Sequence, residues 1–245
     1  MVAGAHDAPA YHRPVTARHA RSCLRRVSKL HVETFESGVF AQNAYIVHED
    51  DATFAVAIDP GAAAPQMADF LADNGLFCEA ILLTHAHLDH IEGVAELVRR
   101  TGAAIHMHAD DRALYEHVQQ QATAFGLEVE RQPPIDATLE HGQRLRFGGI
   151  ELDVRHVPGH SPGHVLFYSE AGGFALVGDV VFSGSIGRTD LPGGSMPGLM
   201  HSIRTQVLTL PDDTVLYPGH GPRTTVERER IGNPFLVPNY GGSLA

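Results

Sequence analysis

The hydrophobic positions from residue 29 onward fall into short runs that alternate with polar and glycine-containing turns. Three early runs occupy residues 29–35, 44–47 and 54–58, and turn residues such as Gly38 separate them. Short runs rich in β-branched and aliphatic residues, bounded by turn residues, are typical of β-strands joined antiparallel. The pattern therefore predicts an antiparallel meander at the start of the folded part.

A helix, a buried strand and a second helix are predicted next. Residues 64–74 place apolar side chains on one side and stop at Gly75, which is typical of a helix end. Residues 80–83 form an uninterrupted aliphatic run, as in a strand that is buried on both faces. Residues 91–98 repeat apolar positions at i, i+3, i+4 and i+7, and Gly102 follows. The polar segment between this strand and the second helix is thus predicted to be a loop.

The later part of the chain repeats this arrangement. Strands are predicted at residues 104–107, 144–147, 150–156, 165–168, 175–177 and 215–217, and helices at residues 109–121, 195–208 and 224–231. Strands gathered in two blocks, each with helices, predict an α/β (α+β) protein in which two sheets pack face to face and helices cover the outside.

Composition separates the first 28 residues from the rest. They contain five arginines and one acid, Asp7, whereas the 245-residue chain as a whole has a net charge of −11. An Arg-rich, acid-poor start resembles an organelle transit peptide, but it lacks the apolar segment of a secretory signal, and we favour a disordered extension. Residues 29–245 are predicted to form a single domain.

Charge and cysteine usage exclude several classes of partner. Lys29 is the only lysine, so the basic surface that nucleic-acid binding requires is not expected. No apolar run approaches the ~18 residues of a membrane-spanning helix. Cys23 and Cys78 are far apart and form no CxxC pair, which fits a reducing, cytoplasmic location.

The main candidate for chemistry directly follows the strand at residues 80–83. His85, His87, Asp89 and His90 lie within six residues there, a spacing that a solvated loop does not need and that metal binding does. The alternative without function is a polar loop that is rich in histidine by chance, in a protein that contains 17 histidines.

Other potential metal ligands follow later predicted strands. His160 and His164 come after the strand at 150–156, and Asp179 and His220 come directly after the last two strands. A glycine stands before His160, Asp179 and His220, and a residue without Cβ permits the sharp turn that directs the next side chain inward. We expect these loops to converge at one edge of the sandwich.

A further His-x-His pair, His106 and His108, falls on the predicted strand at 104–107 and its end. On a strand the two side chains would share one face. Without a neighbouring carboxylate in the pattern, we interpret the pair as structural or supporting rather than as part of the metal site.

The ordered motifs resemble those of the metallo-β-lactamase superfamily. Residues 158–164, 185–190 and 218–222, with Asn233-Pro234, are similar to the glyoxalase II group, the hydroxyacylglutathione hydrolases, over about residues 30–236. The resemblance implies a four-layer αββα sandwich of two mixed sheets. It also implies two divalent metal ions, zinc first, with iron or manganese as alternatives.

The resemblance assigns these ions to seven residues. One ion would be held by His85, His87 and His160, the other by Asp89, His90 and His220, with Asp179 bridging the two. Asp59 matches a position that supports the metal loop by hydrogen bonding, against the alternative of simple turn formation. His164 is expected near the site but not on a metal.

Two such ions lower the pKa of a shared water toward ~7 and polarise a carbonyl oxygen. Asp89 is our candidate for handling the proton. The predicted substrate is a small-molecule hydroxyacyl thioester of the S-lactoylglutathione type, because a thiolate (thiol pKa ~8.5) leaves without acid assistance. Arg188 is the candidate contact for a substrate carboxylate, against a structural salt bridge, and Arg223 and Tyr45 are weaker candidates.

Three alternatives stay open. A persulfide dioxygenase of the same fold holds one iron with two histidines and a carboxylate, and it shares a stretch like residues 187–190. Hydrolysis of a lactam, lactone or phosphodiester is compatible with a site of this type. A non-enzymatic metal-binding or interaction protein is the third. Full-length glyoxalase II enzymes also carry a helical C-terminal domain that contacts glutathione, and with 245 − 220 = 25 residues after His220 we expect the short form without that domain.

Overall fold

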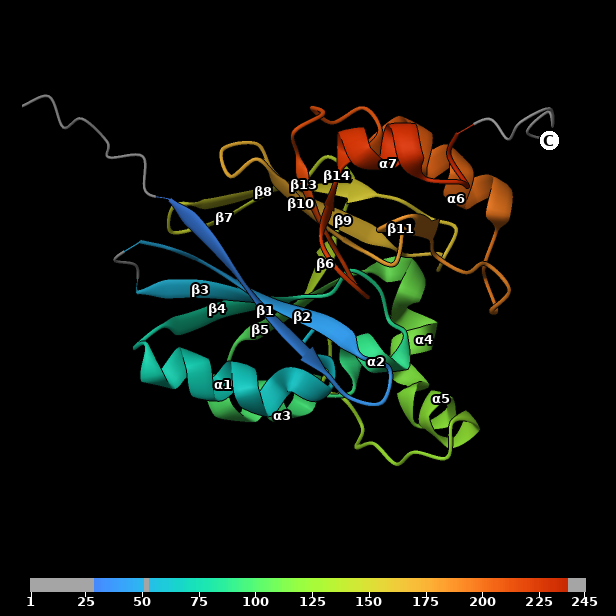
Figure 1. The fold of residues 1–245 in the computed structure, drawn as a ribbon. Coiled ribbons are helices and arrows are strands. Elements are labelled where there is room, and N and C mark those ends of the chain that lie inside the picture. The colour runs from blue at the N-terminus through green and yellow to red at the C-terminus, as the bar shows by residue number, and fades with distance from the viewer. Residues whose placement is uncertain (1–28, 51–52, 238–245) are drawn as a thin grey trace, which may run out of the picture.

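Two large β-sheets pack face to face, and helices cover both outer faces (Figure 1). This is the arrangement in a computed structural model, which describes residues 29–50 and 53–237. The predicted extension at residues 1–28 lies outside the described residues. The predicted four-layer αββα sandwich is confirmed.

Both large sheets have six strands. In spatial order, the first sheet contains β1 (Leu30–Ser37), β2 (Gln42–Glu49), β3 (Phe54–Ile58), β4 (Phe77–Leu82), β5 (Ala104–His108) and β6 (Ala137–Leu139). The second sheet contains β14 (Thr224–Thr225), β13 (Val215–Pro218), β10 (Phe174–Gly178), β9 (Val165–Ser169), β8 (Ile150–His156) and β7 (Arg144–Phe147). A separate small sheet pairs β11 (Val181–Phe182) with β12 (Ser185–Ile186).

Both large sheets are mixed. In the first, β1, β2 and β3 pair antiparallel, which confirms the predicted meander, and β3 to β6 run parallel. In the second, β10 and β13 run parallel and the other pairs are antiparallel. Carboxyl ends of parallel strands meet at the same sheet edge, so the polar segments after β10 and β13 lie together.

Helices cover the sheets according to the alternation of side chains along the strands. Beside the first sheet are α1 (Ala64–Asp73), α2 (Leu88–Ile91), α3 (Val94–Thr101), α4 (Arg112–Glu116) and α5 (Val118–Ala124), and beside the second are α6 (Met196–Ser202) and α7 (Val226–Gly232) (Figure 1). No helix of residues 29–50 and 53–237 has the length and apolar character needed to cross a bilayer.

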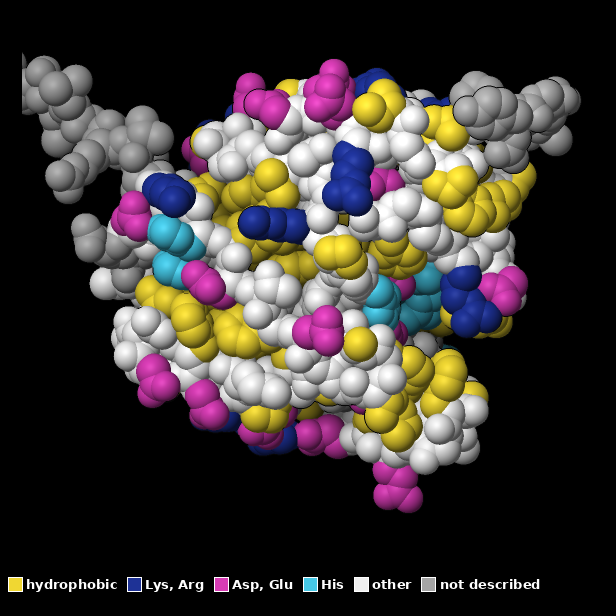
Figure 2. Space-filling view, viewed as in Figure 1, with side chains coloured by type: hydrophobic (Ala, Val, Ile, Leu, Met, Phe, Trp, Pro, Cys, Tyr) yellow, Lys and Arg dark blue, Asp and Glu magenta, His cyan; other side chains and the backbone are white. Residues whose placement is uncertain are grey.

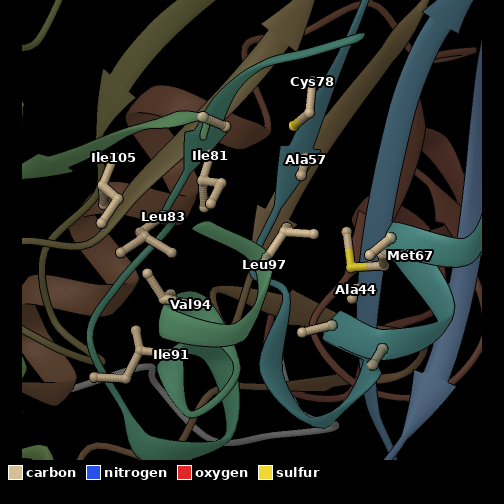
Figure 3. Close-up of a cluster of buried hydrophobic side chains, with 14 of the residues drawn as sticks. Ala44, Ala57, Met67, Cys78, Ile81, Leu83, Ile91, Val94, Leu97 and Ile105 are labelled. Atoms are coloured by element: carbon tan, nitrogen blue, oxygen red, sulfur yellow. The ribbon is translucent and has the colours of Figure 1, made fainter. Parts of the chain in front are cut away.

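Successive side chains of strand β2 point to opposite faces of the sheet, and both faces are buried. Ala44 faces the helices and packs in one cluster with Met67 of α1 and Leu97 of α3 (Figure 3). Val47 faces the opposite way and packs between the sheets with Phe167 of β9. Full burial of each large apolar side chain contributes about 1.5–3 kcal/mol, so both faces fix the strand register.

The predicted helix at residues 109–121 is wrong as a single element. The chain forms a 3₁₀ turn at Ala109–Asp111, then α4 and α5, with a break at His117 (φ −101°, ψ 22°). Both helical pieces bury apolar side chains against the same cluster, so the hydrophobic pattern continues across the break and does not show it.

Three other boundaries also differ. Residues 88–90, predicted as loop, form α2 together with Ile91, and residues 203–207, predicted as part of one helix, form a π-helical turn after α6. Thr224 and Thr225, predicted as helix, pair with β13 as an edge strand before α7 begins. Hydrogen bonding to a neighbouring strand overrides the helical pattern at that point, and a single-sequence pattern does not report such partners.

Candidate metal centre

Four segments that follow strands converge at one edge of the sandwich. They carry all seven predicted ligand residues: His85, His87, Asp89 and His90 after β4, His160 after β8, Asp179 after β10 and His220 after β13. Between α2 and β11, the molecular surface shows a group of histidine side chains with basic and acidic side chains beside them (Figure 2). The structure thus brings together residues from both sheets.

The first group consists of His85, His87 and His160. One ring nitrogen of each lies within 4.8 Å of the other two, and all three residues are buried. Nδ1 of His87 lies 2.8 Å from Nε2 of His160. Nε2 of His85 is buried without a hydrogen-bond partner. Three imidazole nitrogens therefore face a common point, as in a three-histidine metal site.

The second group consists of Asp89, His90 and His220, whose ligand atoms also lie within 4.8 Å of one another. Oδ2 of Asp89 is 3.1 Å from Nε2 of His220 and 3.8 Å from Nε2 of His90. The His90 side chain is fully buried, whereas those of Asp89 and His220 are 17% and 29% exposed. This group contains a carboxylate and reaches the surface.

Asp179 lies between the two groups. Its Oδ2 is 3.4 Å from Nε2 of His160 and 3.6 Å from Nε2 of His220. Its Oδ1 is 3.4 Å from Nε2 of His90 and has no hydrogen-bond partner. A Cβ at Gly219 would lie 2.1 Å from that Oδ1, so the residue before His220 must be glycine for the carboxylate to fit.

Asp59 supports the second group through His90. Its Oδ2 lies 2.9 Å from Nδ1 of His90, and it accepts hydrogen bonds from the backbone N–H and the hydroxyl of Thr84. An Nδ1–H donated to a carboxylate leaves Nε2 as the free lone pair. Of the two alternatives for Asp59, the structure shows the hydrogen-bonding contact, and the residue also forms a tight turn (φ 47°).

Backbone carbonyl groups orient two further histidines. Nδ1 of His160 donates to the carbonyl oxygen of Arg188 over 2.8 Å, and Nδ1 of His220 donates to that of Phe40 over 3.1 Å. In each ring Nε2 is then the bare nitrogen and points into the site. The sequence motifs do not reveal these partners, because every residue carries the same carbonyl group.

His164 lies between the first group and the Asp179 segment. Its Nε2 accepts a hydrogen bond of 3.0 Å from the backbone N–H of Asp179, and its ring stacks on His85 at 4.6 Å between centroids. Burial lowers the pKa of His164 well below its usual range, so the ring is neutral, and because Nε2 accepts this hydrogen bond the proton is on Nδ1. His164 therefore positions the Asp179 segment and offers no lone pair to a metal.

Asp111 is a buried carboxylate that the sequence interpretation missed. It accepts hydrogen bonds from the backbone N–H of Ala86 (3.0 Å), the hydroxyl of Ser161 (2.7 Å) and the backbone N–H of Gly163 (2.6 Å). Burial raises its pKa, although these three donors oppose the shift. Asp111 therefore ties the segment of His85 and His87 to the segment of His160. In the sequence Asp111 is the second residue of an Asp-Asp pair at a turn, a common pattern that does not indicate a buried supporting carboxylate.

Electrostatics differ across the centre. Burial, reinforced by His160, lowers the pKa of His87 to about 3, so its ring is neutral and its lone pair is available. At His90, burial acts to lower the pKa, but the charges of Asp89 and Asp179 raise it well above its usual range. The carboxylates thus favour a positive charge at the second group.

The residues present fit metal ions. Buried nitrogens of His85 and His90 and one oxygen of Asp179 have no hydrogen-bond partner, and such groups are costly unless a ligand satisfies them. Imidazole and carboxylate without thiolate suit zinc, iron or manganese. Cys78 is buried in the hydrophobic cluster of Figure 3 and belongs to none of the ligand groups.

The three proposed substrate contacts differ in exposure and in partners. The Arg188 guanidinium makes a forked ion pair with Asp190 (2.7 and 2.8 Å), and both side chains are exposed. Arg223 and Tyr45 line a surface cavity of about 510 Å³, and the Tyr45 hydroxyl donates to the carbonyl of Pro218. The structural salt bridge weighed for Arg188 is therefore present.

The additional His-x-His pair, His106 and His108, lies outside the candidate metal centre. His106 packs edge-on against Phe147, with ring centroids 6.1 Å apart, and His108 stacks on His156 at 4.2 Å. Neither belongs to the two ligand groups described above.

Comparison with known proteins gives one family. The family model described as "Metallo-beta-lactamase superfamily" matches residues 37–220. Hydroxyacylglutathione hydrolase GloC of Haemophilus influenzae is 37% identical over 214 residues, which cover 84% of this chain and 98% of that protein.

Two solved structures are similar in sequence and fold. TTHA1623 in a di-iron-bound form is 42% identical, with a TM-score of 0.77 over 84% of this chain and 100% of that one. The BLEG-1 B3 metallo-β-lactamase is 36% identical, with a TM-score of 0.80 over 85% and 100% of the two chains. The hydroxyacylglutathione hydrolase GloC and the β-lactamase BLEG-1 are thus almost equally similar to this chain, at 37% and 36% identity, although their names denote different substrates.

Proposed function

The chain belongs to the metallo-β-lactamase superfamily of metal-dependent hydrolases, and we propose that it hydrolyses hydroxyacyl thioesters of the S-lactoylglutathione type. The observation that carries this proposal is the position of Asp179 between two separate three-residue ligand groups. That arrangement supports a dinuclear centre, as glyoxalase II chemistry requires. The fold binds metals, and the seven ligand roles and the count of two ions are part of the proposal.

A bound pair of divalent ions supplies hydroxide at neutral pH and polarises the substrate carbonyl. The protein residues have distinct tasks around that chemistry. Asp89 combines a ligand position with partial exposure, so its carboxylate is placed to orient the attacking oxygen and to accept its proton. Asp59 and the carbonyl group of Arg188 hold His90 and His160 in the tautomers that expose Nε2.

The leaving group favours a thioester over an amide. Amide cleavage requires a proton donor for a basic nitrogen, whereas a thiolate departs near neutral pH because thiol pKa values are ~8.5. The hydroxyl of Tyr45 already donates to the carbonyl oxygen of Pro218, two residues before His220, and burial raises its pKa far above the usual range. A site whose nearby hydroxyl is committed in this way suits a substrate that needs no acid.

Arg188 is the proposed contact for a carboxylate of the thiol carrier. Its guanidinium is exposed, and its own backbone carbonyl group accepts the hydrogen bond from His160. The present partner of the guanidinium, Asp190, is also exposed. A substrate carboxylate would therefore replace Asp190 in the same forked geometry, at little cost because exposed ion pairs contribute about 1 kcal/mol or less.

The test compares acyl substrates on the same metal-loaded protein. Protein loaded separately with zinc, iron(II) or manganese is assayed against S-lactoylglutathione, the corresponding lactoyl amide and a chromogenic β-lactam. We expect a kcat/KM of about 10⁴ M⁻¹s⁻¹ or higher for the thioester and at least ~100-fold less for the other two. Asp179→Asn protein provides the background rate.

Two outcomes would redirect the proposal. Preferential β-lactam cleavage would retain the hydrolase and replace the substrate, in line with the similarity to BLEG-1. Oxygen uptake with a persulfide, together with a single iron per chain, would favour the dioxygenase and leave the second ligand group without a metal.

A further inference from the structure

A third cluster of metal-ligand side chains lies outside the candidate centre. His108 ends β5, Asp110 follows in the 3₁₀ turn, and His156 ends β8. One ligand atom from each lies within 4.8 Å of the other two. Because β5 belongs to the first sheet and β8 to the second, the cluster spans the junction of the two sheets.

We propose that His108, Asp110 and His156 form a separate site for one divalent ion of the zinc, cobalt or nickel class. Two imidazoles and one carboxylate suit such borderline ions, whereas calcium and magnesium prefer sites built from oxygen alone. An ion held there cross-links the two sheets. This site goes beyond the proposed hydrolase function and does not depend on it.

The tautomer of His156 is already that of a metal ligand. Its Nε2–H donates to the carbonyl oxygen of Pro162 over 2.8 Å, which leaves Nδ1 as the bare nitrogen. His160 in the candidate centre is held in the same manner, by a carbonyl group on one ring nitrogen. Donation of the other ring N–H to a carbonyl is the usual support of a metal-binding histidine.

His108 has only a weak competing interaction. Its Nδ1 accepts a long hydrogen bond (3.3 Å) from the backbone N–H of Asp110 and lies 3.8 Å from Oδ2 of the same residue. Burial and the neighbouring His156 lower the pKa of His108, which favours the neutral ring, and only this long hydrogen bond competes with a cation for its one nitrogen lone pair.

Metal binding requires one histidine ring to turn out of the stack. The rings of His108 and His156 are nearly parallel, 10° apart, with centroids at 4.2 Å, whereas the lone pair of each nitrogen lies in its ring plane. His108 is the ring that turns, because its Nδ1 has only a long hydrogen bond, whereas His156 is held by Pro162. Zn–N bonds of ~2.0–2.1 Å place tetrahedral ligands about 3.4 Å apart, so ligand atoms that now lie within 4.8 Å of one another must close by at most about 1.4 Å. The Asp110 side chain is 58% exposed and is free to move toward the ion, and water completes the coordination.

The test counts ions rather than activity. Wild-type protein, His108→Gln and Asp110→Asn are dialysed to equilibrium against Zn²⁺ across a range of concentrations, and bound zinc per chain is measured by mass spectrometry. His201→Gln is the matched control, because His201 is an exposed histidine on α6. We expect wild type and control to bind one more Zn²⁺ per chain than His108→Gln, and Asp110→Asn to bind that extra ion at least 10-fold more weakly.

A second measurement distinguishes loss of the metal site from misfolding of His108→Gln. Visible absorption of Co²⁺-loaded protein reports tetrahedral nitrogen and oxygen ligands, and Asp110→Asn changes only an exposed side chain. Loss of one cobalt species in His108→Gln, and its saturation only at higher Co²⁺ concentration in Asp110→Asn, with unchanged circular dichroism, supports the site. Equal metal content and equal spectra in all four proteins would show that the His108–His156 stack is a packing contact between the sheets.

Discussion

The two ligand groups of the candidate metal centre differ in charge and in access to solvent. His85, His87 and His160 are all imidazoles and all buried, whereas Asp89 brings a carboxylate to a group that is partly exposed. A neutral, enclosed group is suited to holding an ion, and a charged, open group is suited to meeting water and substrate. The difference suggests a division of labour within one site.

Their supports differ in a parallel way. His90 in the second group is held by one buried carboxylate, Asp59, which contacts the ring directly. The first group is held by Asp111, which contacts no ring and ties the backbone of the two contributing segments together. One support sets the electronic state of a ligand, and the other sets the distance between segments.

Asp179→Asn should have the largest effect, because it removes the charge that both groups share. We expect kcat/KM to fall on the order of 10³-fold, since several kcal/mol of electrostatic stabilisation are lost at about 1.4 kcal/mol per factor of ten. Bound metal should fall at both groups. Asp213→Asn, at an exposed carboxylate, is the control. Undiminished activity in Asp179→Asn would rule out a shared bridging role.

Asp89→Ala should separate the two groups. We expect loss of one ion and of most hydrolysis, about 10²-fold, with the fold intact, because the enclosed histidines keep the other ion. His87→Gln is the matched variant and should release an ion from the first group instead. Metal counts and circular dichroism provide the measurement. Full activity in Asp89→Ala would defeat the two-metal interpretation.

Asp59→Asn should affect the second group selectively. Supporting partners of metal-binding histidines typically contribute 10–100-fold in metal affinity, and we expect a loss of that size for one ion only. Asparagine is the appropriate replacement because it tolerates the positive φ of 47° at this position. Thr84→Ser, which keeps the hydroxyl donor to Asp59, should bind metal as wild type does. Equal loss at both ions would contradict the selective role.

Asp111→Asn should act on the first group through stability. An amide in place of the carboxylate turns N–H groups toward the N–H of Ala86 or Gly163, which costs about 1–3 kcal/mol. We expect a fall of several degrees in the melting temperature and weaker binding of the more enclosed ion. Asp110→Asn is the neighbouring control in metal-free protein. An unchanged melting temperature would show that these hydrogen bonds add little.

Arg188→Ala should have the smallest effect. The variant keeps the carbonyl group that holds His160 and removes only the exposed guanidinium. We expect KM for S-lactoylglutathione to rise about three- to tenfold with kcat nearly constant, as for an exposed charged contact. Arg204→Ala is the control at an exposed arginine. A fall in kcat without a change in KM would place Arg188 in a different role.

Much of the fold was visible in the sequence because burial imposes a simple period. The apolar run in β2, which is buried on both faces, and the i, i+3, i+4 spacing before Gly102 mark locally which positions are buried. The break at His117 was missed because the hydrophobic pattern continues across it, and the edge strand at Thr224–Thr225 was missed because it depends on pairing with β13.

The sequence by itself determined the ligand types, their order and their position after strands, because a metal site needs particular side chains on short, glycine-containing turns. Only the tertiary structure decided which side chains face each other. It placed Asp179 between the groups and set the carbonyl groups of Arg188 and Phe40 behind two histidines. It also buried Asp111 beneath both segments and brought His108 against His156. These contacts join residues from separate strands, and backbone carbonyl groups are identical in every residue, so a linear pattern carries no record of them.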